Sequence, residues 1–310
     1  MPSTLYPFAG LLSRFTRLVL VALALCACST RPEVTSLVGE TAITAEDIAY
    51  RQAVMAVRSG QEFPPHLALL QIIQESLMAE IGQAYDIVVS KDMLAAEAAR
   101  VQADSRDPKT LARIQAIFGD DEAAYHRLVL QPILINQLLH ARFSLGHDIQ
   151  AKPLARAQAL LTAARAAPAS LPALAKEFGG EYRQLEIVEG RIRHGDDPGE
   201  AIAPELAQPD VEWPDYDREF IEQIVIKGQI GELHPKVVED RYSFMLVRLL
   251  SREGDHALLE SVVIAKLDFV SWFQAQSQRV PLTINDRALR EAILAEVDLP
   301  YITDRLSTGE

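Results

Sequence analysis

Cysteine and aromatic residues are scarce in this chain of 310 residues. The only two cysteines, Cys26 and Cys28, lie in an apolar segment near the N-terminus. The rest of the chain therefore has no cysteine for an intrachain disulfide or a cysteine metal site. Aromatic residues make up 6% of the chain and hydrophobic residues 49%, with alanine and leucine prominent, which favours a helix-rich protein over an all-β one.

Basic runs and the common catalytic signatures are also missing. The formal net charge of −13 argues against a protein that binds the phosphate backbone of nucleic acids. There is no G-x-S-x-G, phosphate-binding glycine loop or H-E-x-x-H, so hydrolase, nucleotide-binding and zinc-protease functions have no support. His140 and His147 are isolated, and the acidic runs at 120–122 and 196–197 are typical of a helix cap and a loop. We expect no metal and no cofactor.

The N-terminus has the features of an export signal. Arg14 and Arg17 precede the apolar run 18–27, which is too short to span a membrane. The sequence Leu25-Cys26-Ala27-Cys28 resembles the bacterial lipobox, in which the last cysteine is diacylated; the alternative is that Cys28 is an ordinary residue of the apolar run. We expect a lipoprotein signal peptide over residues 1–27, a lipid anchor at Cys28 and a tether over 28–36. Ser29 resembles the signal that sorts lipoproteins to the periplasmic face of the outer membrane.

Residues 37–150 are expected to form an N-terminal helical domain. A brief strand over 37–44 turns at Gly39, and Thr44 with Asp47 forms the capping box of the first helix. Helical spacing and capping residues predict helices over 45–57, 66–83, 91–102, 110–118 and from Asp120 or Asp121 to 143, the last one bent or restarted at Pro132.

Residues 151–252 are expected to form an α+β module, followed by a C-terminal helical segment over 253–310 that packs back on the N-terminal domain. The module is predicted to contain a helix, or a strand leading into a helix, over 154–167, a short helix over 171–178, a strand over 184–188, a long loop over 190–213, a helix over 216–227 and a strand over 242–250. The last segment is predicted to contain a helix over 255–278, extended chain over 280–284 and a last helix to about residue 296, which Asn285 or Asp286 caps. The fold class is therefore α+β and mostly helical.

These features together resemble a known family. The segment V-G-E-x-x-I-T-x-x-D over 38–47, the helical half, the α+β module and the returning helix are similar to the periplasmic chaperones and foldases built around a parvulin peptidyl-prolyl isomerase domain. The similarity covers nearly all of the chain after the signal. Inside the module, Leu174-Ala175, Gly179-Gly180 and the stretch 220–238 with Gly228, Gly231 and Pro235 resemble family motifs. Lipoprotein members of this kind also occur beside exopolysaccharide machinery.

The chain departs from the family at two histidine positions. The motif A-x-H-I-L of the first strand falls on 157–161, with Ala159 in place of the histidine, and G-x-H-I-I-K-L falls on 243–249, with Met245 in place of the second. The remaining candidates nearby, His194 and His234, lie in expected loops, and Asp240 could replace the acidic member of the site. The catalytic residues therefore stay unassigned.

The resemblance implies a lipid-anchored chaperone or foldase that binds unfolded or extended polypeptides of the envelope. Its substrate pocket would be lined by Leu171, Phe220, Phe244 and Met245. Two alternatives remain open: an active peptidyl-prolyl cis-trans isomerase of the parvulin type, and a scaffold lipoprotein of an envelope secretion or polysaccharide complex.

Overall fold

A computed structural model describes residues 33–104, 107–166, 170–188, 191–193, 221–254 and 256–307. Several sequence predictions fall outside these ranges. They are the signal peptide, the lipobox with Cys28, the start of the tether, most of the loop 190–213, His194, Phe220 and the first residues of the helix 216–227.

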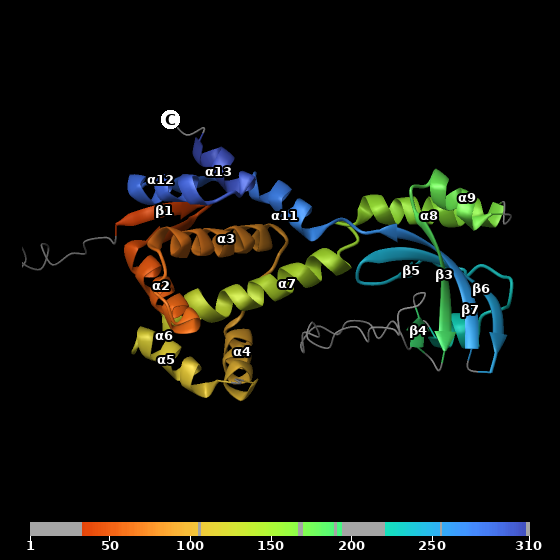
Figure 1. Cartoon of the computed structure of the whole chain (residues 1–310), viewed down its shortest axis with the longest axis horizontal. Coiled ribbons are helices and arrows are strands. Elements are labelled where there is room, and N and C mark those ends of the chain that lie inside the picture. The colour runs from red at the N-terminus through yellow and green to blue at the C-terminus, as the bar shows by residue number, and fades with distance from the viewer. Residues whose placement is uncertain are drawn as a thin grey trace, which may run out of the picture.

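The described chain forms two lobes joined by the long helix α7 and by a return segment (Figure 1). The helical lobe contains β1 (Val34–Val38), β2 (Thr41–Thr44), α2 (Ala45–Ser59), α3 (Pro65–Ala84), α4 (Lys91–Asp104), α5 (Pro108–Phe118), α6 (Glu122–Tyr125), the π-helix η1 (His126–Leu130), α7 (Gln131–Leu145), α11 (Phe269–Ser277), β8 (Leu282–Ile284), α12 (Arg287–Glu296) and α13 (Pro300–Ser307). The sheet lobe contains α8 (Ala151–Ala166), α9 (Leu171–Glu177), β3 (Glu181–Val188), β4 (Arg191–Arg193), the π-helix η3 (Ile221–Ile226), β5 (Val238–Glu239), β6 (Ser243–Glu253) and β7 (His256–Ala265). The mostly helical α+β fold predicted from the sequence is confirmed.

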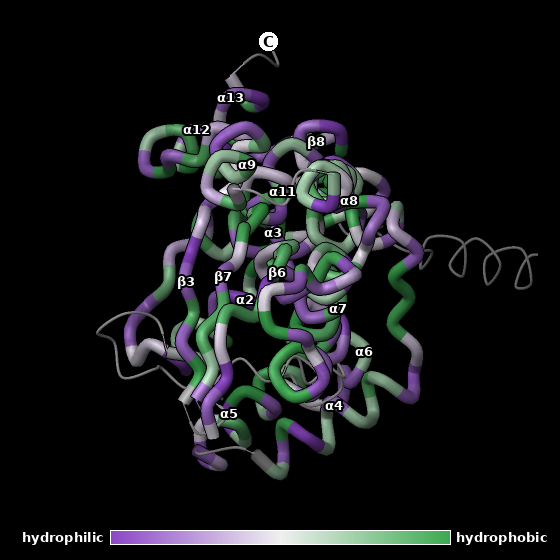
Figure 2. Tube along the Cα trace, turned by 90° about the vertical axis from the view of Figure 1, so that its right-hand side faces the viewer, coloured by the Kyte–Doolittle hydropathy of each residue, from purple (hydrophilic) through white to green (hydrophobic). Residues whose placement is uncertain are grey.

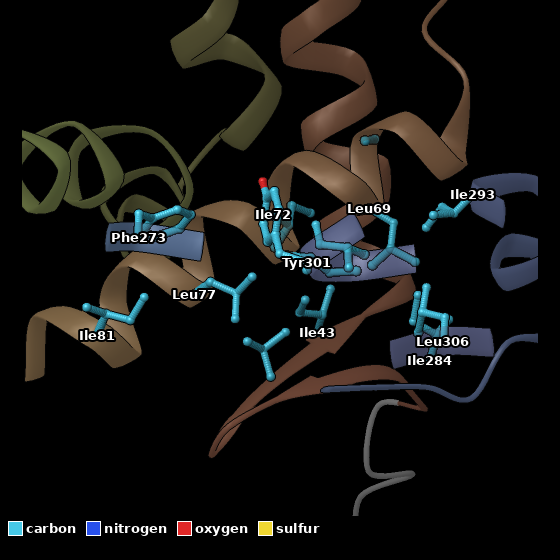
Figure 3. Packing of buried hydrophobic residues seen from close by; sticks show 14 of the residues in the cluster. Ile43, Leu69, Ile72, Leu77, Ile81, Phe273, Ile284, Ile293, Tyr301 and Leu306 are labelled. Atoms are coloured by element: carbon cyan, nitrogen blue, oxygen red, sulfur yellow. The ribbon is translucent and has the colours of Figure 1, made fainter. Parts of the chain in front are cut away.

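Both ends of the described chain build the core of the helical lobe. Strand β1 pairs with β2 on one side and with β8 on the other, so that Ser36 lies opposite Ile284. Leu69 and Leu77 of α3 pack in one cluster with Phe273, Ile293 and other residues of the C-terminal segment (Figure 3). Each such fully buried side chain stabilises the fold by about 1.5–3 kcal/mol, so the lobe depends on its last third as much as on its first.

Side-chain caps determine where the helices of this lobe begin. The predicted capping box is confirmed: the hydroxyl of Thr44 accepts from the Asp47 amide, and the Asp47 carboxylate accepts from the Thr44 amide. Asp121 and Asp286 cap the helices that follow them, also as predicted. The π-helix η1 directly precedes Pro132, which lies in the first turn of α7 and lacks the amide that an unbroken helix would need there.

The sheet lobe is a five-stranded antiparallel sheet in the order β4-β3-β7-β6-β5. In Figure 2 the sheet lobe faces the viewer, with β3, β7 and β6 side by side. Helices α8 and α9 cover one face, where Phe244 and Leu246 of β6 are buried. Val247 and Leu249 point to the opposite face and pack with Ile224 of η3. These even-numbered and odd-numbered side chains of β6 face opposite sides of the sheet, because successive side chains of a strand alternate between its two faces.

Two predictions about elements are wrong. The stretch 256–265 is strand β7, whereas the sequence analysis expected the first part of a helix over 255–278. The apolar residues of β7 satisfy helical spacing as well as strand packing, and its pairing with β3 and β6 decides in favour of the strand. The module boundary expected at residue 252 would separate β6 from its partner β7, and the sheet lobe instead continues to Ala265. Strand β1 also begins at Val34, inside the expected tether.

At the start of the module the sequence left two alternatives open, a helix and a strand leading into a helix, and the structure shows the helix. Residues 157–161, which carry the similarity to A-x-H-I-L, lie within helix α8. Alanine is the strongest helix former, and this stretch is alanine-rich, so local preference explains the helix. None of the described helices combines the length and apolar character that crossing a membrane requires.

A buried ion pair supports the helical lobe at its centre. The guanidinium of Arg51 on α2 donates to the Glu75 carboxylate on α3 and, at 2.6 Å, to the Leu128 carbonyl of η1. Arg51 is 4% exposed, and burial lowers its pKa although the neighbouring carboxylate partly compensates. One side chain thus joins three helical segments in a region of low dielectric.

We expect Arg51→Met to lower the free energy of unfolding by about 3–5 kcal/mol, because it leaves a carboxylate and a carbonyl without their cation. Chemical denaturation measures the difference. Arg287→Met is the matched control, since it removes an exposed arginine that pairs with Glu291 and should leave stability unchanged. Equal stability of the two variants would show that the buried pair has no net effect.

Candidate functional site

A cavity of about 300 Å³ lies on the η3 face of the sheet lobe. Three segments form it: helix η3, the turn that follows it and strand β6. Its lining combines apolar and polar side chains: Ile224, Leu233, Pro235, Val247 and Leu249 are apolar, and Gln223, Lys227, Gln229, Glu232 and His234 are polar. This size is at the lower end of small-molecule sites, roughly 300–1,000 Å³, and suits one or two side chains of a peptide better than a large cofactor.

Two glycines shape the turn between η3 and the cavity mouth. At Gly228 a Cβ atom would lie 2.0 Å from the carbonyl oxygen of Ile224, so no other residue fits where the chain leaves the helix. Gly231 has a φ of +84°, in the left-handed region that side chains disfavour. The sequence analysis noted both glycines only as part of the family similarity; their backbone requirement is the physical reason for them.

Arginine side chains hold the ends of this segment. Arg252 donates to the carbonyls of Val225 at 2.6 Å and Ile226 at 2.5 Å, which satisfies acceptors left open at the end of η3. Arg165 on α8 donates to the Pro235 carbonyl. The cavity wall is therefore tied to β6 at one end and to a helix on the opposite side of the sheet at the other.

The turn itself runs along β6 and forms the outer wall. The Gly231 amide donates to the Leu249 carbonyl at 2.7 Å, and the His234 amide donates to the Val247 carbonyl at 2.8 Å. The floor is rigid, because Val247 is fully buried and Leu249 is 2% exposed in the middle of the sheet.

His234 is the titratable group with the most altered environment at this site. Burial lowers its pKa from the ordinary value of 6.5, and the positive charge of Lys236 lowers it further. The imidazole is therefore neutral at pH 7 and can both donate and accept a hydrogen bond at the cavity edge. Among the described residues that line this cavity there is no serine, threonine or cysteine.

The structure does not bring the predicted pocket residues together. Leu171 and Phe244 are buried in the core between α8, α9 and the sheet, and neither lines the cavity. Met245 points to the opposite face, the same one as the cavity, but does not line it. Phe220 is outside the described residues. The predicted pocket was wrong because Phe244 and Met245, as successive residues of a strand, must face opposite ways.

The two positions of the missing histidines are also apart. Ala159 is exposed on α8, which covers one face of the sheet, and Met245 lies on the other face. Asp240 is a turn residue whose carboxylate accepts from the Tyr242 and Ser243 amides. Of the two polar candidates that the structure describes, His234 lines the cavity and Asp240 does not.

Sequence reasoning missed the residues of the cavity floor. The predicted strand over 242–250 could have identified them, because side chains alternate along a strand and Met245, Val247 and Leu249 therefore share one face. Among the residues that the structure describes, no group of three or more histidine, cysteine or acidic side chains could hold a metal ion.

The chain matches no protein-family model, and no curated protein is similar to it. Its function must therefore be argued from the site itself.

The environment of His234 makes a testable prediction. In an NMR titration we expect the His234 ring to titrate below pH 6.5, and Lys236→Gln should raise its midpoint without restoring the ordinary value, because burial is the larger cause. His140 is an internal comparison, because burial and then Arg241 lower its pKa. Arg241→Gln should raise the titration midpoint of His140 and leave the midpoint of His234 unchanged. An ordinary midpoint for His234 in the unmodified protein would mean that its ring is solvated.

Proposed function

We propose that this protein binds extended polypeptide and that the cavity beside β6 receives one apolar side chain of the client, proline among those that fit. The apolar floor of Val247 and Leu249 under a partly open mouth is the observation that carries the proposal. Peptide-binding sites of this kind take an apolar side chain in a pocket and satisfy the backbone at their rim. The side chains of Gln223, Gln229 and His234 supply such polar groups.

The location we propose follows from the N-terminal sequence. Lipidation at Cys28 would hold the protein at the periplasmic face of the outer membrane, where its clients would be unfolded envelope polypeptides. Since Val34 already belongs to the folded lobe, only residues 29–33 would separate the anchor from it. The net charge of −13 would repel acidic polypeptides, so it favours clients that are recognised through apolar contacts.

Binding can be tested with a fluorescent, extended peptide that contains proline and leucine, measured by anisotropy. We expect Leu233→Asp to weaken binding about tenfold or more, because it places a charge in the apolar lining of the cavity. Val88→Asp is the matched control, since it adds the same charge at an exposed apolar residue of the helical lobe and should leave affinity unchanged. Equal affinity of both variants would exclude the cavity as the binding site.

An isomerase that works through His234 is the second candidate, and the neutral imidazole beside an apolar cavity is the observation that favours it. Prolyl rotation must lower a barrier of about 18–20 kcal/mol, and a single imidazole without a paired group offers little selective stabilisation of the twisted amide.

We therefore expect the cis-trans exchange of a proline peptide, followed by NMR, to proceed at its uncatalysed rate of about 10–100 s per event with the protein present. An acceleration that disappears in His234→Ala would contradict this and establish the enzyme. An acceleration that persists in that variant would place catalysis elsewhere.

A further inference from the structure

The two lobes meet where the chain crosses between them twice. The first crossing runs from the end of α7 to the start of α8, and the second runs from the end of β7 to α11. Gln150, which is fully buried, links them: its side chain donates to the Phe143 carbonyl at 3.1 Å and accepts from the Leu267 amide at 2.9 Å. Both crossings therefore share one hydrogen-bonding side chain.

Lys266 makes a second and stronger link at the same place. Its side chain is 2% exposed, and its ammonium donates to the Ser144 carbonyl and to the Glu239 carboxylate, each at 2.7 Å. The same ammonium lies 5.0 Å from the centre of the Phe244 ring. A buried lysine needs such partners, since an ammonium without them would be costly to remove from water.

Glu239 carries this link to the edge of the sheet. Its second carboxylate oxygen lies 2.7 Å from Nε2 of His147, in the first crossing. Glu239 belongs to the two-residue strand β5, which lies at the edge of the sheet as described and pairs with β6, where Val238 lies opposite Met245. An edge strand of two residues forms few backbone hydrogen bonds with its neighbour. Its position therefore depends on the contacts of the Glu239 side chain with Lys266 and His147.

Strand β5 continues the segment that forms the outer wall of the cavity. That wall is attached to β6 by the amides of Gly231 and His234, and Glu239 lies at its far end. The segment from Gly231 to Glu239 therefore forms the cavity wall at its start and contacts the lobe junction at its end.

We propose that Lys266 and Glu239 act as a latch, so that opening of the lobe junction and loosening of the cavity wall are a single event. Lys266 and Glu239 are positioning residues in this arrangement, since they act on the cavity through β5. The inference goes beyond the proposed function, because it holds whatever the cavity binds and is tested without a ligand.

Native-state hydrogen exchange of the unmodified protein is the first test. At low guanidinium concentrations the amides of Gly231, His234 and Leu267 should exchange with one common free energy of opening and one common denaturant dependence, both smaller than those of the β6–β7 ladder. Exchange of Leu267 that is independent of the other two would overturn the proposal, since the junction would then open without the wall.

Variants give the second test. Lys266→Met should speed exchange of the Gly231 and His234 amides about tenfold or more relative to the β6–β7 ladder. Glu239→Gln keeps the size of the side chain and removes its charge, so it should also speed exchange of the Gly231 and His234 amides. It serves as the test variant if Lys266→Met does not fold. Arg287→Met is the control, because it removes an exposed cation of the helical lobe and should leave the relative exchange of these two amides unchanged. Unchanged exchange in the folded latch variants would disprove the coupling.

Discussion

Strand β7 is the element on which both lobes depend. It forms hydrogen-bonded ladders along both edges, with β6 on one side and β3 on the other, so that Leu259 lies opposite Leu249 and Leu185. Its side chains also supply both cores of the sheet lobe, with Val262 and Ile264 on one face and Ala257 and Leu259 on the other. Without this strand, β3 and β6 would be separate edges.

The place of β7 in the chain has a consequence for the whole molecule. The strand ends at Ala265, and the residues that complete the helical lobe, from Phe269 onward, come after it. The helical lobe is therefore built from two segments that the sheet lobe separates in sequence. Long-range pairings of this kind, such as β1 with β8, require closure of a large loop before they contribute stability. The polar links of the junction lie where the chain enters and leaves the sheet lobe, at Gln150 and Lys266.

Sequence alone predicted the parts of the fold that depend on contacts within a few residues. The capping of α2 by Thr44 and of α12 by Asp286 was predicted because each cap joins a side chain to an amide three residues away. The helix expected over 255–278 failed because Val262 and Val263 fit either spacing, and only pairing with distant strands settles the choice. For 157–161 the family resemblance favoured a strand and helix propensity favoured a helix, and the structure shows the helix. The same local reasoning would have separated Phe244 from Met245.

The cavity favours affinity over catalysis for a physical reason. An apolar floor interacts with a proline ring or a leucine side chain in the same way whether the neighbouring amide is planar or twisted. Such uniform binding lowers the free energy of the bound ground state and of the transition state equally, so it gives no acceleration. Differential stabilisation must come from polar groups aimed at the rotating amide, and the positions where the family resemblance would place two histidines lie on opposite sides of the sheet in this chain. In the function that we propose, the imidazole of His234 at the rim would orient a client and the floor of Val247 and Leu249 would hold it, which a protein that retains extended chains without changing them requires.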